Sequence, residues 1–436
     1  MQKELFFIAK PLKSACLAVW SDKQTIKIIL FLAAVQILGL LTGILFLPHG
    51  HAYTAGNILN KLLAWDGRHY LIIAQNGYIW DPTYCTTHFC NLAFFPLQGL
   101  IDRLFLFIFT PNVAIAAILL SSWALGVASI FYFARLARSV MGQGAGNAIF
   151  LYAMYPGSAF YLMGYPTGII LLTIILALHN ALTQQWWRSA LWIGLGSAAG
   201  SASIFIGLPI GIYYLFDQFK RYLILRAGFN SLGWASLALS GLLLFMAYQY
   251  ISFSDATAFM AAQIPWTGSV TFATKISLLT TFHTYVASYL GYLYWYKFAF
   301  HTLLLQHGNE IIFLQNAKWH LCDFIQMVIQ AGLNLFFFAL AWTGVMSGVF
   351  FISGKKARIL LCASSLCILF SYEWFILATN WSMESTIRLL FPAIAIFLGL
   401  GGLCYKFKFL EYGLFPFFTI VTFWQMASVT SGFIVT

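Results

Sequence analysis

Long tracts without a single charged residue are the feature that most constrains this 436-residue chain. A bilayer core requires about 20 apolar residues per helix, and most of these tracts are long enough to cross it. Only 8% of the residues are charged, against roughly 25% in a typical soluble protein. The sequence therefore predicts an all-α polytopic membrane protein. The charge-free tracts cover residues 104–134, 139–187, 189–216, 227–254, 324–354, 389–405 and 412–436.

The basic residues indicate how the chain is threaded through the membrane. With the N-terminus in the cytoplasm, about eleven spans leave two polar regions outside, residues 48–110 and 251–325. This threading puts most Lys and Arg residues inside, as the positive-inside rule requires. The whole chain, residues 1–436, then forms one integral-membrane domain. The expected spans lie near residues 28–47, 112–134, 145–162, 168–184, 189–203, 205–217, 229–250, 327–353, 359–378, 388–405 and 413–433.

Two further segments are apolar enough to cross the membrane but are interpreted as interfacial or re-entrant helices. Residues 91–109 carry Asp102 and Arg103, and residues 276–296 are rich in Thr, Ser, Tyr and His. If either segment crossed alone, the charge bias of everything downstream would be reversed. The net charge of +11 does not indicate a nucleic-acid partner, because the basic residues are scattered at tract ends without interleaved aromatic residues.

The stretch from Ala64 to Tyr78, A-W-D-G-R-H-Y-L-I-I-A-Q-N-G-Y, gathers charge in a chain that carries little of it. Its spacing predicts a short amphipathic helix from Leu62 to Gln75, lying on the outer leaflet with Trp65 at the interface. Arg68 would point away from the face that looks into the protein. That face would carry Asp66, His69, Tyr70 and Ile73.

A carboxylate in this position has two readings. Acidic side chains at membrane depth commonly mark functional sites, and a base that accepts a proton from a hydroxyl must be an outer-side acid or a histidine. Asp66 is the candidate that the stretch favours. Alternatively, Asp66 pairs with Arg68 or caps a turn, because a charged loop outside a membrane is ordinary.

Several segments resemble the PIG-V mannosyltransferases, the family of the second GPI mannosyltransferase and its bacterial relatives. The specific match is W-D-G-R-H-Y-L-I-I-A-Q-N-G-Y at residues 65–78, and weaker matches are F-F-P-L at 94–97 and P-G-S-A-F at 156–160. Arg388 and Pro392 match an Arg–x–x–x–Pro helix start. The chain lacks a glutamate that the family carries near Tyr165 and an arginine that it carries near Ser203. These departures favour a divergent bacterial member or a degenerate one.

The resemblance implies a GT-C-like bundle and a reaction on the extracytoplasmic or luminal side. Enzymes of this class take a sugar from a polyprenyl-phosphate donor, dolichyl or undecaprenyl, and pass it to an acceptor hydroxyl with inversion. Asp66 would be the general base. Arg388, with its helix dipole, would bind the donor phosphate, with Arg68 and His69 as the next candidates. Mannose as the sugar, and a glycolipid or other membrane-associated acceptor, follow from the resemblance alone.

Other outer-side residues are candidates for lining the sugar and acceptor pocket. A tryptophan at a membrane interface is more often an anchor than a pocket residue. Glu384 precedes Arg388 by one turn and would orient it, or equally be a solvated loop charge. The candidates are Trp65, Tyr70, Tyr165, Gln263, Trp266 and Glu384.

Cys85 and Cys90 lie in the first outer region, where an oxidising environment would allow a local disulfide. A zinc site there would need a fourth ligand and better spacing. The chain contains no Asp-x-Asp, and a monophosphate donor demands less of a divalent ion than a nucleotide diphosphate. We therefore expect no cofactor and no metal requirement.

Two alternatives remain open. The chain could be a related lipid-linked sugar enzyme with another sugar, or a transporter or flippase of lipid-linked sugars. A transporter should have paired broken helices near the midplane and symmetry between its halves, which the sequence does not show. The expected setting is multi-pass in the bacterial plasma membrane, or in the endoplasmic reticulum if the source is eukaryotic. Eukaryotic members of the resembled family work with a small membrane partner subunit.

Overall fold

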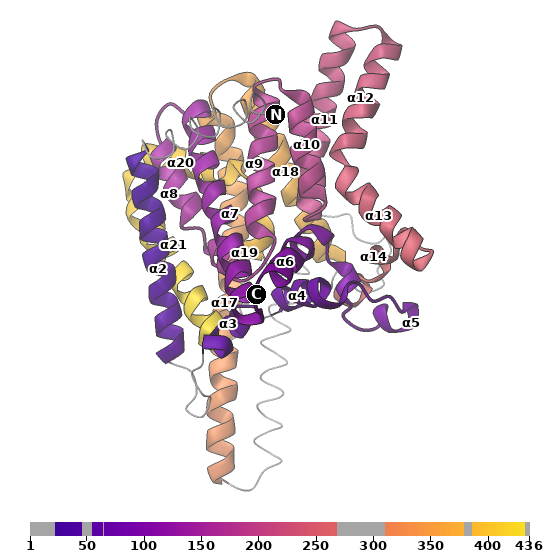
Figure 1. The fold of residues 1–436 in the computed structure, drawn as a ribbon. Coiled ribbons are helices and arrows are strands. Elements are labelled where there is room, and N and C mark those ends of the chain that lie inside the picture. The colour runs from indigo at the N-terminus through magenta and orange to yellow at the C-terminus, as the bar shows by residue number, and fades with distance from the viewer. Residues whose placement is uncertain (1–21, 46–54, 64, 268–309, 379–385, 432–436) are drawn as a thin grey trace.

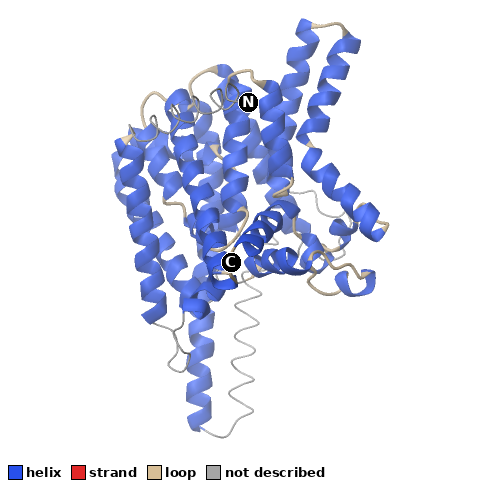
Figure 2. Cartoon of the chain, in the orientation of Figure 1, coloured by secondary structure: helices blue, strands red, loops and turns tan. Residues whose placement is uncertain are grey.

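The computed structural model describes residues 22–45, 55–63, 65–267, 310–378 and 386–431. Every regular element in these residues is a helix, as Figure 2 shows, so the predicted all-α class is confirmed. The helices are α2 (Lys23–Leu45), α3 (Ala55–Leu62), α4 (Asp66–Asn76), α5 (Pro82–Cys85), α6 (Pro96–Ile108), α7 (Pro111–Val140), α8 (Ala145–Ala153), α9 (Thr167–Leu182), α10 (Trp186–Ser197), α11 (Ser201–Arg221), α12 (Ile224–Ala238), α13 (Ser240–Phe253), α14 (Ala258–Ala261), α15 (Ile264–Thr267), α17 (Glu310–Phe351), α18 (Lys355–Ala378), α19 (Thr386–Leu390), α20 (Ala395–Lys406) and α21 (Lys408–Ser431), with the 3-10 helices η1 (Asn91–Ala93) and η2 (Pro156–Leu162).

Five helical segments in the described residues are long and apolar enough to cross a membrane, or up to 7 if each bent pair is one span. The five lie in α2, α7, α11, α17 and α21. The bent pairs are η2 with α9, at 115°, and α12 with α13, at 65°. The predicted count of about eleven is not confirmed. One reason is that several expected spans are short helices, because α8 ends at Ala153 and α10 at Ser197.

The break between α8 and η2 lies in the core, and polar side chains from other helices satisfy its backbone. The Gln36 side-chain amide donates to the Ser158 carbonyl at 3.0 Å, and the Thr422 hydroxyl donates to the Met154 carbonyl at 2.7 Å. Tyr152 stacks on Phe133 with ring centroids 4.2 Å apart. Irregular backbone inside a membrane protein requires such internal partners. The break can therefore turn the chain toward the site without exposing peptide groups to lipid.

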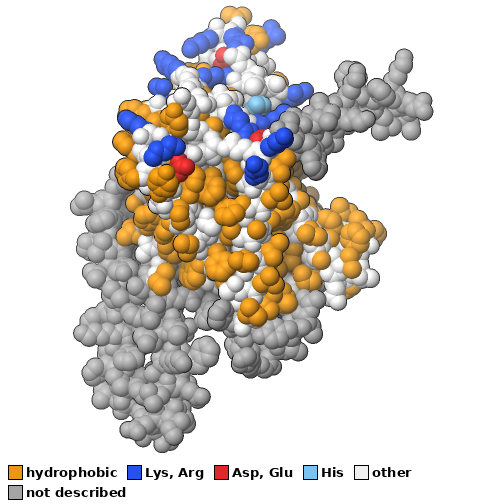
Figure 3. Space-filling model, turned by 90° about the vertical axis from the view of Figure 1, so that its left-hand side faces the viewer, with side chains coloured by type: hydrophobic (Ala, Val, Ile, Leu, Met, Phe, Trp, Pro, Cys, Tyr) orange, Lys and Arg blue, Asp and Glu red, His pale blue; other side chains and the backbone are white. Residues whose placement is uncertain are grey.

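Lys and Arg side chains gather at one end of the bundle, above a surface covered by hydrophobic side chains (Figure 3). Helix ends that are far apart in sequence meet there. Arg138 at the end of α7 bonds Asp22 before α2, with Nη2 and Oδ1 2.9 Å apart. The Lys356 ammonium at the start of α18 donates to the carbonyl of Leu182 at the end of α9, at 3.1 Å. The threading predicts that this end of the bundle lies on the cytoplasmic side.

At the other end of the bundle, α4 and α6 lie across the long helices (Figure 1). The two helices touch closely, since a Cβ added at Gly99 of α6 would lie 2.7 Å from Ile73 Cγ2 of α4. With 13 residues, α6 is too short to cross a bilayer, in keeping with an interfacial helix. The second expected segment of this kind, residues 276–296, lies outside the described residues.

The predicted helix from Leu62 to Gln75 is wrong at its start. α3 ends at Leu62 and α4 begins at Asp66. Between them Trp65 adopts a φ of 52°, which is rare for a residue other than glycine and breaks the helix. Asp66 is therefore the first residue of a new helix, and the turn before it determines where its side chain points.

Candidate active site

The start of α4 is docked onto the turn that joins η2 to α9. The backbone N–H of Asp66 donates to the Tyr165 hydroxyl at 3.2 Å. At Gly67, a Cβ would lie 2.5 Å from the Met163 carbonyl oxygen, which is backbone and cannot swing aside. Gly164 in the same turn has a φ of +65°, a conformation that suits glycine. The W-D-G sequence thus fits this turn because its third residue has no side chain.

Asp66 forms an ion pair with Arg388 of α19, 322 residues further along the chain. The exposed fractions of the two side chains are 24% for Arg388 and 25% for Asp66, so the pair is partly shielded from solvent. The Arg388 guanidinium also lies over two aromatic rings, 5.2 Å from the centroid of Tyr165 and 5.7 Å from that of Phe160. Burial opposes the charge on Arg388, but Asp66 raises the pKa of the guanidinium above its ordinary value. Arg388 is therefore permanently protonated and positively charged.

The Arg–x–x–x–Pro pattern predicted that Arg388 lies at the start of a helix, and this prediction is wrong. It belongs to the last turn of α19, which ends at Leu390, and α20 begins only at Ala395 beyond Pro392. A helix C-terminus attracts cations rather than anions. An anion at this position would therefore be bound by the guanidinium charge itself and not by a helix dipole.

Tyr70 and His69 lie beside this pair on α4. Tyr70 is buried, and its hydroxyl pKa is raised first by burial and then by the charge of Asp66. His69 stacks on Phe94 with ring centroids 4.6 Å apart. Burial lowers the pKa of His69, with a smaller opposing effect from Asp66, so its imidazole is largely neutral at neutral pH. A neutral imidazole can donate a hydrogen bond to a phosphate but adds no charge.

The remaining predicted residues are placed less centrally. Arg68 is exposed, on the side of α4 away from the site, as the helical spacing predicted. Trp65 is half-buried and packs in an apolar cluster with Leu63 and Tyr165. The Gln263 side-chain amide donates to the Ala93 carbonyl at 2.7 Å. Ala93 precedes Phe94, whose ring stacks on His69. Glu384 and the side chain of Trp266 lie outside the described residues.

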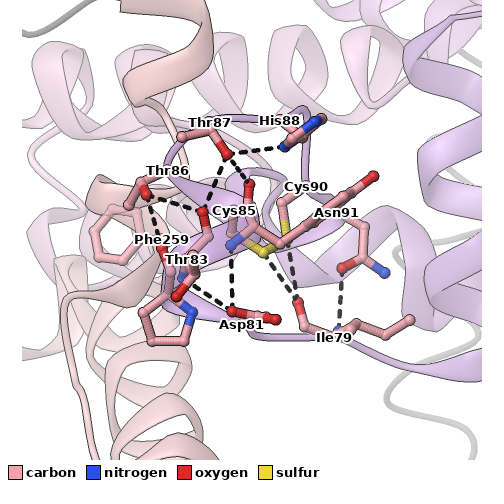
Figure 4. The surroundings of a disulfide bond; sticks show 12 residues. Ile79, Asp81, Thr83, Cys85, Thr86, Thr87, His88, Cys90, Asn91 and Phe259 are labelled. Atoms are coloured by element: carbon pink, nitrogen blue, oxygen red, sulfur yellow. Dashed lines mark hydrogen bonds between the residues drawn. A yellow bond between two sulfur atoms is a disulfide. The ribbon is translucent and has the colours of Figure 1, made fainter.

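The loop after α4 is closed by a disulfide between Cys85 and Cys90, whose Cα atoms are 5.1 Å apart (Figure 4). Asn91 donates to the Gly77 carbonyl at 3.0 Å and accepts from the Ile79 N–H at 3.2 Å. The Tyr78 hydroxyl donates to the Phe94 carbonyl at 2.9 Å. The end of α4 is thereby tied to the segment that supports His69.

The same loop joins the two predicted outer regions. Cys85 and Cys90 pack in one apolar cluster with Phe245 of α13 and with Ala258 and Ala262, in and just beyond α14. The described part of the second region, residues 251–267, therefore lies on the same side of the bundle as the first. That both regions lie outside the membrane stays a prediction.

Sequence reasoning missed two features of the site. Phe160, quoted above only as part of a motif, lies under the Arg388 guanidinium. Asp102 of α6 is fully buried and accepts a hydrogen bond from the Gln98 amide at 2.7 Å. Burial raises the pKa of the Asp102 carboxyl to about 7, against a smaller lowering by Gln98. The i, i+4 spacing of Gln98 and Asp102 in an apolar helix was the signal that could have found this pair.

Substitution of Gly67 by alanine should disturb the docking of α4, because the new Cβ meets the Met163 backbone. We expect Gly67→Ala to lower the free energy of unfolding by on the order of 1–3 kcal/mol, as overpacking does. Thermal unfolding of the purified protein in detergent measures this loss. Gly142→Ala is the matched control, since nothing lies within 4 Å of the position of its Cβ. Equal melting temperatures for the two variants would refute the close approach.

No family model matches the chain, and no curated protein sequence matches it. Among solved structures, the fold is similar to the oligosaccharyltransferase of Archaeoglobus fulgidus. The apo crystal structure matches with a TM-score of 0.45 and 15% identity, covering 95% of this chain and 57% of that chain. The form tethered to an acceptor peptide with the NVT sequon matches with a TM-score of 0.42 and 15% identity, covering 92% and 55%. This chain thus spans just over half the length of that protein.

Proposed function

We propose that this chain is an integral-membrane glycosyltransferase of the GT-C type, which moves a sugar from a polyprenyl-phosphate donor to an acceptor hydroxyl. The observation that carries the proposal is the ion pair of Asp66 and Arg388 beside the Tyr165 hydroxyl. Three distant segments of the chain converge here and bring together the Asp66 carboxylate, the Arg388 cation and the Tyr165 hydroxyl. The carboxylate and the cation are the groups that displacement of a phosphate by an alcohol requires, and the Tyr165 hydroxyl accepts a hydrogen bond from the backbone N–H of the carboxylate residue.

In the proposed reaction, Asp66 accepts the proton of the acceptor hydroxyl. The acceptor oxygen then forms a bond to the anomeric carbon of the sugar as the bond from that carbon to the phosphate oxygen breaks. The electron pair of that bond leaves with the phosphate, and the product polyprenyl phosphate carries the extra negative charge. Arg388 stabilises this charge. A single displacement of this kind inverts the configuration of the anomeric carbon.

Before the donor binds, the two catalytic groups neutralise each other. Asp66 is held by Arg388 and is poorly placed to accept a proton from an alcohol. A donor phosphate offers Arg388 a second anion, and guanidinium groups bind phosphate with paired hydrogen bonds. Binding of the donor would therefore draw Arg388 away and free the carboxylate, so that the base acts only when the leaving group is in place.

The finer assignment to mannose and to the PIG-V family is supported by where the resembling segments lie. The W-D stretch carries Asp66, the P-G-S-A-F segment carries Phe160 under Arg388, and Phe94 of the F-F-P-L segment stacks on His69. Segments that resemble one family and lie far apart in sequence meet at one place. We propose polyprenyl-phosphate mannose as the donor and a glycolipid or other membrane-associated molecule as the acceptor.

An extracytoplasmic or luminal site is supported by two features. The Cys85–Cys90 disulfide lies in the loop that follows α4, and disulfides persist in oxidising compartments. The basic side chains gather at the end of the bundle opposite to α4 (Figures 1 and 3). We propose the bacterial plasma membrane as the setting, or the endoplasmic reticulum membrane if the source is eukaryotic.

Reconstitution of the purified protein in vesicles with labelled polyprenyl-phosphate mannose and a lipid extract tests the proposal. A glycosyltransferase releases polyprenyl phosphate and transfers the label to an acceptor in the extract. A flippase would move the intact labelled lipid across the bilayer without cleaving it. Movement of the label without cleavage would overturn the proposed function in favour of a transporter.

The proposed reaction should proceed without a divalent cation. Arg388 already supplies a positive charge for the single phosphate of the donor, so we expect a chelator such as EDTA to leave the transfer rate unchanged within about twofold. The measurement compares initial rates with and without EDTA, and after addition of Mg²⁺ or Mn²⁺. A rate that collapses with EDTA and returns with the metal would show that metal independence is wrong.

A further inference from the structure

Asp102 is a buried acid that the proposed reaction does not use. Its side chain is 0% exposed, although it belongs to α6, a short helix at the end of the bundle that carries the site. Aspartate is almost never fully buried unless it has a partner. Its position therefore requires an explanation.

The hydrogen bonds around Asp102 indicate a neutral carboxyl. Its Oδ1 accepts from Gln98 Nε2 at 2.7 Å, and the same amide nitrogen lies 3.5 Å from the Ser122 hydroxyl of α7. The other carboxyl oxygen, Oδ2, and the Gln98 carbonyl oxygen are both buried without a hydrogen-bond partner. Two acceptors in one bonded pair lack a donor, and a proton on Asp102 would convert one of them into a donor. An ionised carboxylate would leave both acceptors unsatisfied in an apolar environment.

Asp102 is linked to the active site through α4. Gly99 lies three residues before Asp102 on α6. A Cβ added at Gly99 would lie 2.7 Å from Ile73 Cγ2 and 3.7 Å from the Tyr70 carbonyl oxygen. Tyr70 lies near enough to Asp102, Asp66 and Arg388 for a charge on any of them to affect its hydroxyl. A change in the contact between α6 and α4 therefore acts directly on the residue beside the ion pair.

We infer that Asp102 is a positioning residue of the active site, which as a neutral, buried acid lets α6 pack closely between α4 and α7 and so keeps Tyr70 beside the Asp66–Arg388 pair. The kinetic part of this inference rests on the proposed function. Asp102 touches neither donor nor acceptor, and its effect on the reaction passes through Tyr70.

Ionisation of Asp102 should loosen this arrangement, because the new charge needs water or another donor. The carboxyl pKa of about 7 places this change near neutral pH. On α6 itself, Arg103 is exposed and points away, and the part of α7 that contacts α6 carries no charged residue. Among the described titratable groups, Tyr70 of α4 is the one that interacts with Asp102, and Asp66 and Arg388 act on Tyr70 in turn.

The sign of the pH dependence follows from burial. The unfolded carboxyl ionises near its ordinary pKa of 3.8, whereas the folded one holds its proton up to about pH 7. The contribution of Asp102 to the free energy of unfolding is therefore fully present below pH 3.8 and is lost as the pH rises to about 7. In the folded protein, the neutral form disappears as the pH rises through about 7, and the transfer rate should fall with it.

Infrared difference spectroscopy and initial rates, both measured between about pH 5 and about pH 9, test the inference. Wild-type protein should lose a protonated-carboxyl band and most of its rate as the pH rises through about 7. Asp102→Asn, a neutral isostere, should lack the band and keep its rate at high pH. Gln98→Met removes the donor that lowers the Asp102 pKa, so it should move the midpoint of the band to higher pH.

Asp81→Asn, an exposed carboxylate on the same side of the bundle, is the matched control and should change neither the band nor the pH profile. A band that survives in Asp102→Asn, or identical pH profiles for wild type and Asp102→Asn, would overturn the inference. If no protein transfers sugar, wild type included, the proposed function fails alone. The band and its midpoint in wild type and Gln98→Met would then still support or overturn the neutral Asp102.

Discussion

Asp66→Asn should lower the rate of sugar transfer by about 10²- to 10⁴-fold, the usual contribution of a general base. Asparagine keeps the shape of the side chain and can still contact Arg388, but it cannot accept the proton of the acceptor hydroxyl. Initial rates with saturating polyprenyl-phosphate mannose measure the loss. The same variant should bind the product, polyprenyl phosphate, more tightly than wild type, because Arg388 is no longer held by a carboxylate.

These two effects distinguish a base from a residue that merely orients Arg388. If Asp66 only positioned the guanidinium, its removal would weaken the binding of polyprenyl phosphate together with the rate. Asp81→Asn is the control for the general effect of removing one negative charge near an anion site, and it should leave both quantities unchanged. Weaker binding by Asp66→Asn would contradict the proposed competition between the carboxylate and the phosphate.

Arg388→Lys should lower the transfer rate by roughly 10²- to 10³-fold, the range seen when one group that stabilises an anionic transition state is removed. Lysine retains the positive charge but lacks the planar fork that binds a phosphate with two hydrogen bonds. It also lacks the planar group that contacts the rings of Tyr165 and Phe160. The Michaelis constant for the donor should rise as well, since the ground-state phosphate loses the same contacts.

Arg103→Lys is the matched control for this substitution, because Arg103 is exposed on α6 near the same end of the bundle. Its rate and donor affinity should equal those of wild type. Melting temperatures of both variants show whether a loss of rate reflects a loss of fold. A folded Arg388→Lys protein with the rate of wild type would remove Arg388 from the proposed reaction.

The sequence was sufficient to single out Asp66 and Arg388, but not to pair them. Each was a charged residue beside an apolar tract, and each lay in a segment that resembles a glycosyltransferase family. Their ion pair closes over 322 residues and depends on how α19 approaches α4. Hydropathy and spacing report the neighbours of a residue within one helix, and they contain no information on such a contact.

The local course of the backbone was harder to predict than the helical class. The positive φ of Trp65 separates α3 from α4, although tryptophan has no special preference for that region. Likewise, the apolar tract of residues 139–187 predicted two full spans, whereas α8 and η2 form an irregular path supported by Gln36 and Thr422. In both cases tertiary contacts outweigh local propensity.

Asp102 illustrates a limit of another kind. From the sequence, its charge argued only that residues 91–109 do not cross the membrane. Its burial and its bond to Gln98 become visible once α6 is packed against α4 and α7. Because most aspartates are exposed, the residue type itself predicted the opposite of what the fold shows.

A structure of the protein bound to a non-hydrolysable analogue of polyprenyl-phosphate mannose would show whether the donor phosphate displaces Asp66 from Arg388. We expect the donor phosphate to contact the Arg388 guanidinium and the Asp66 carboxylate to have separated from it. The carboxylate should face the anomeric carbon from the side opposite the phosphate. A phosphate bound elsewhere, with the Asp66–Arg388 pair still closed, would contradict this expectation.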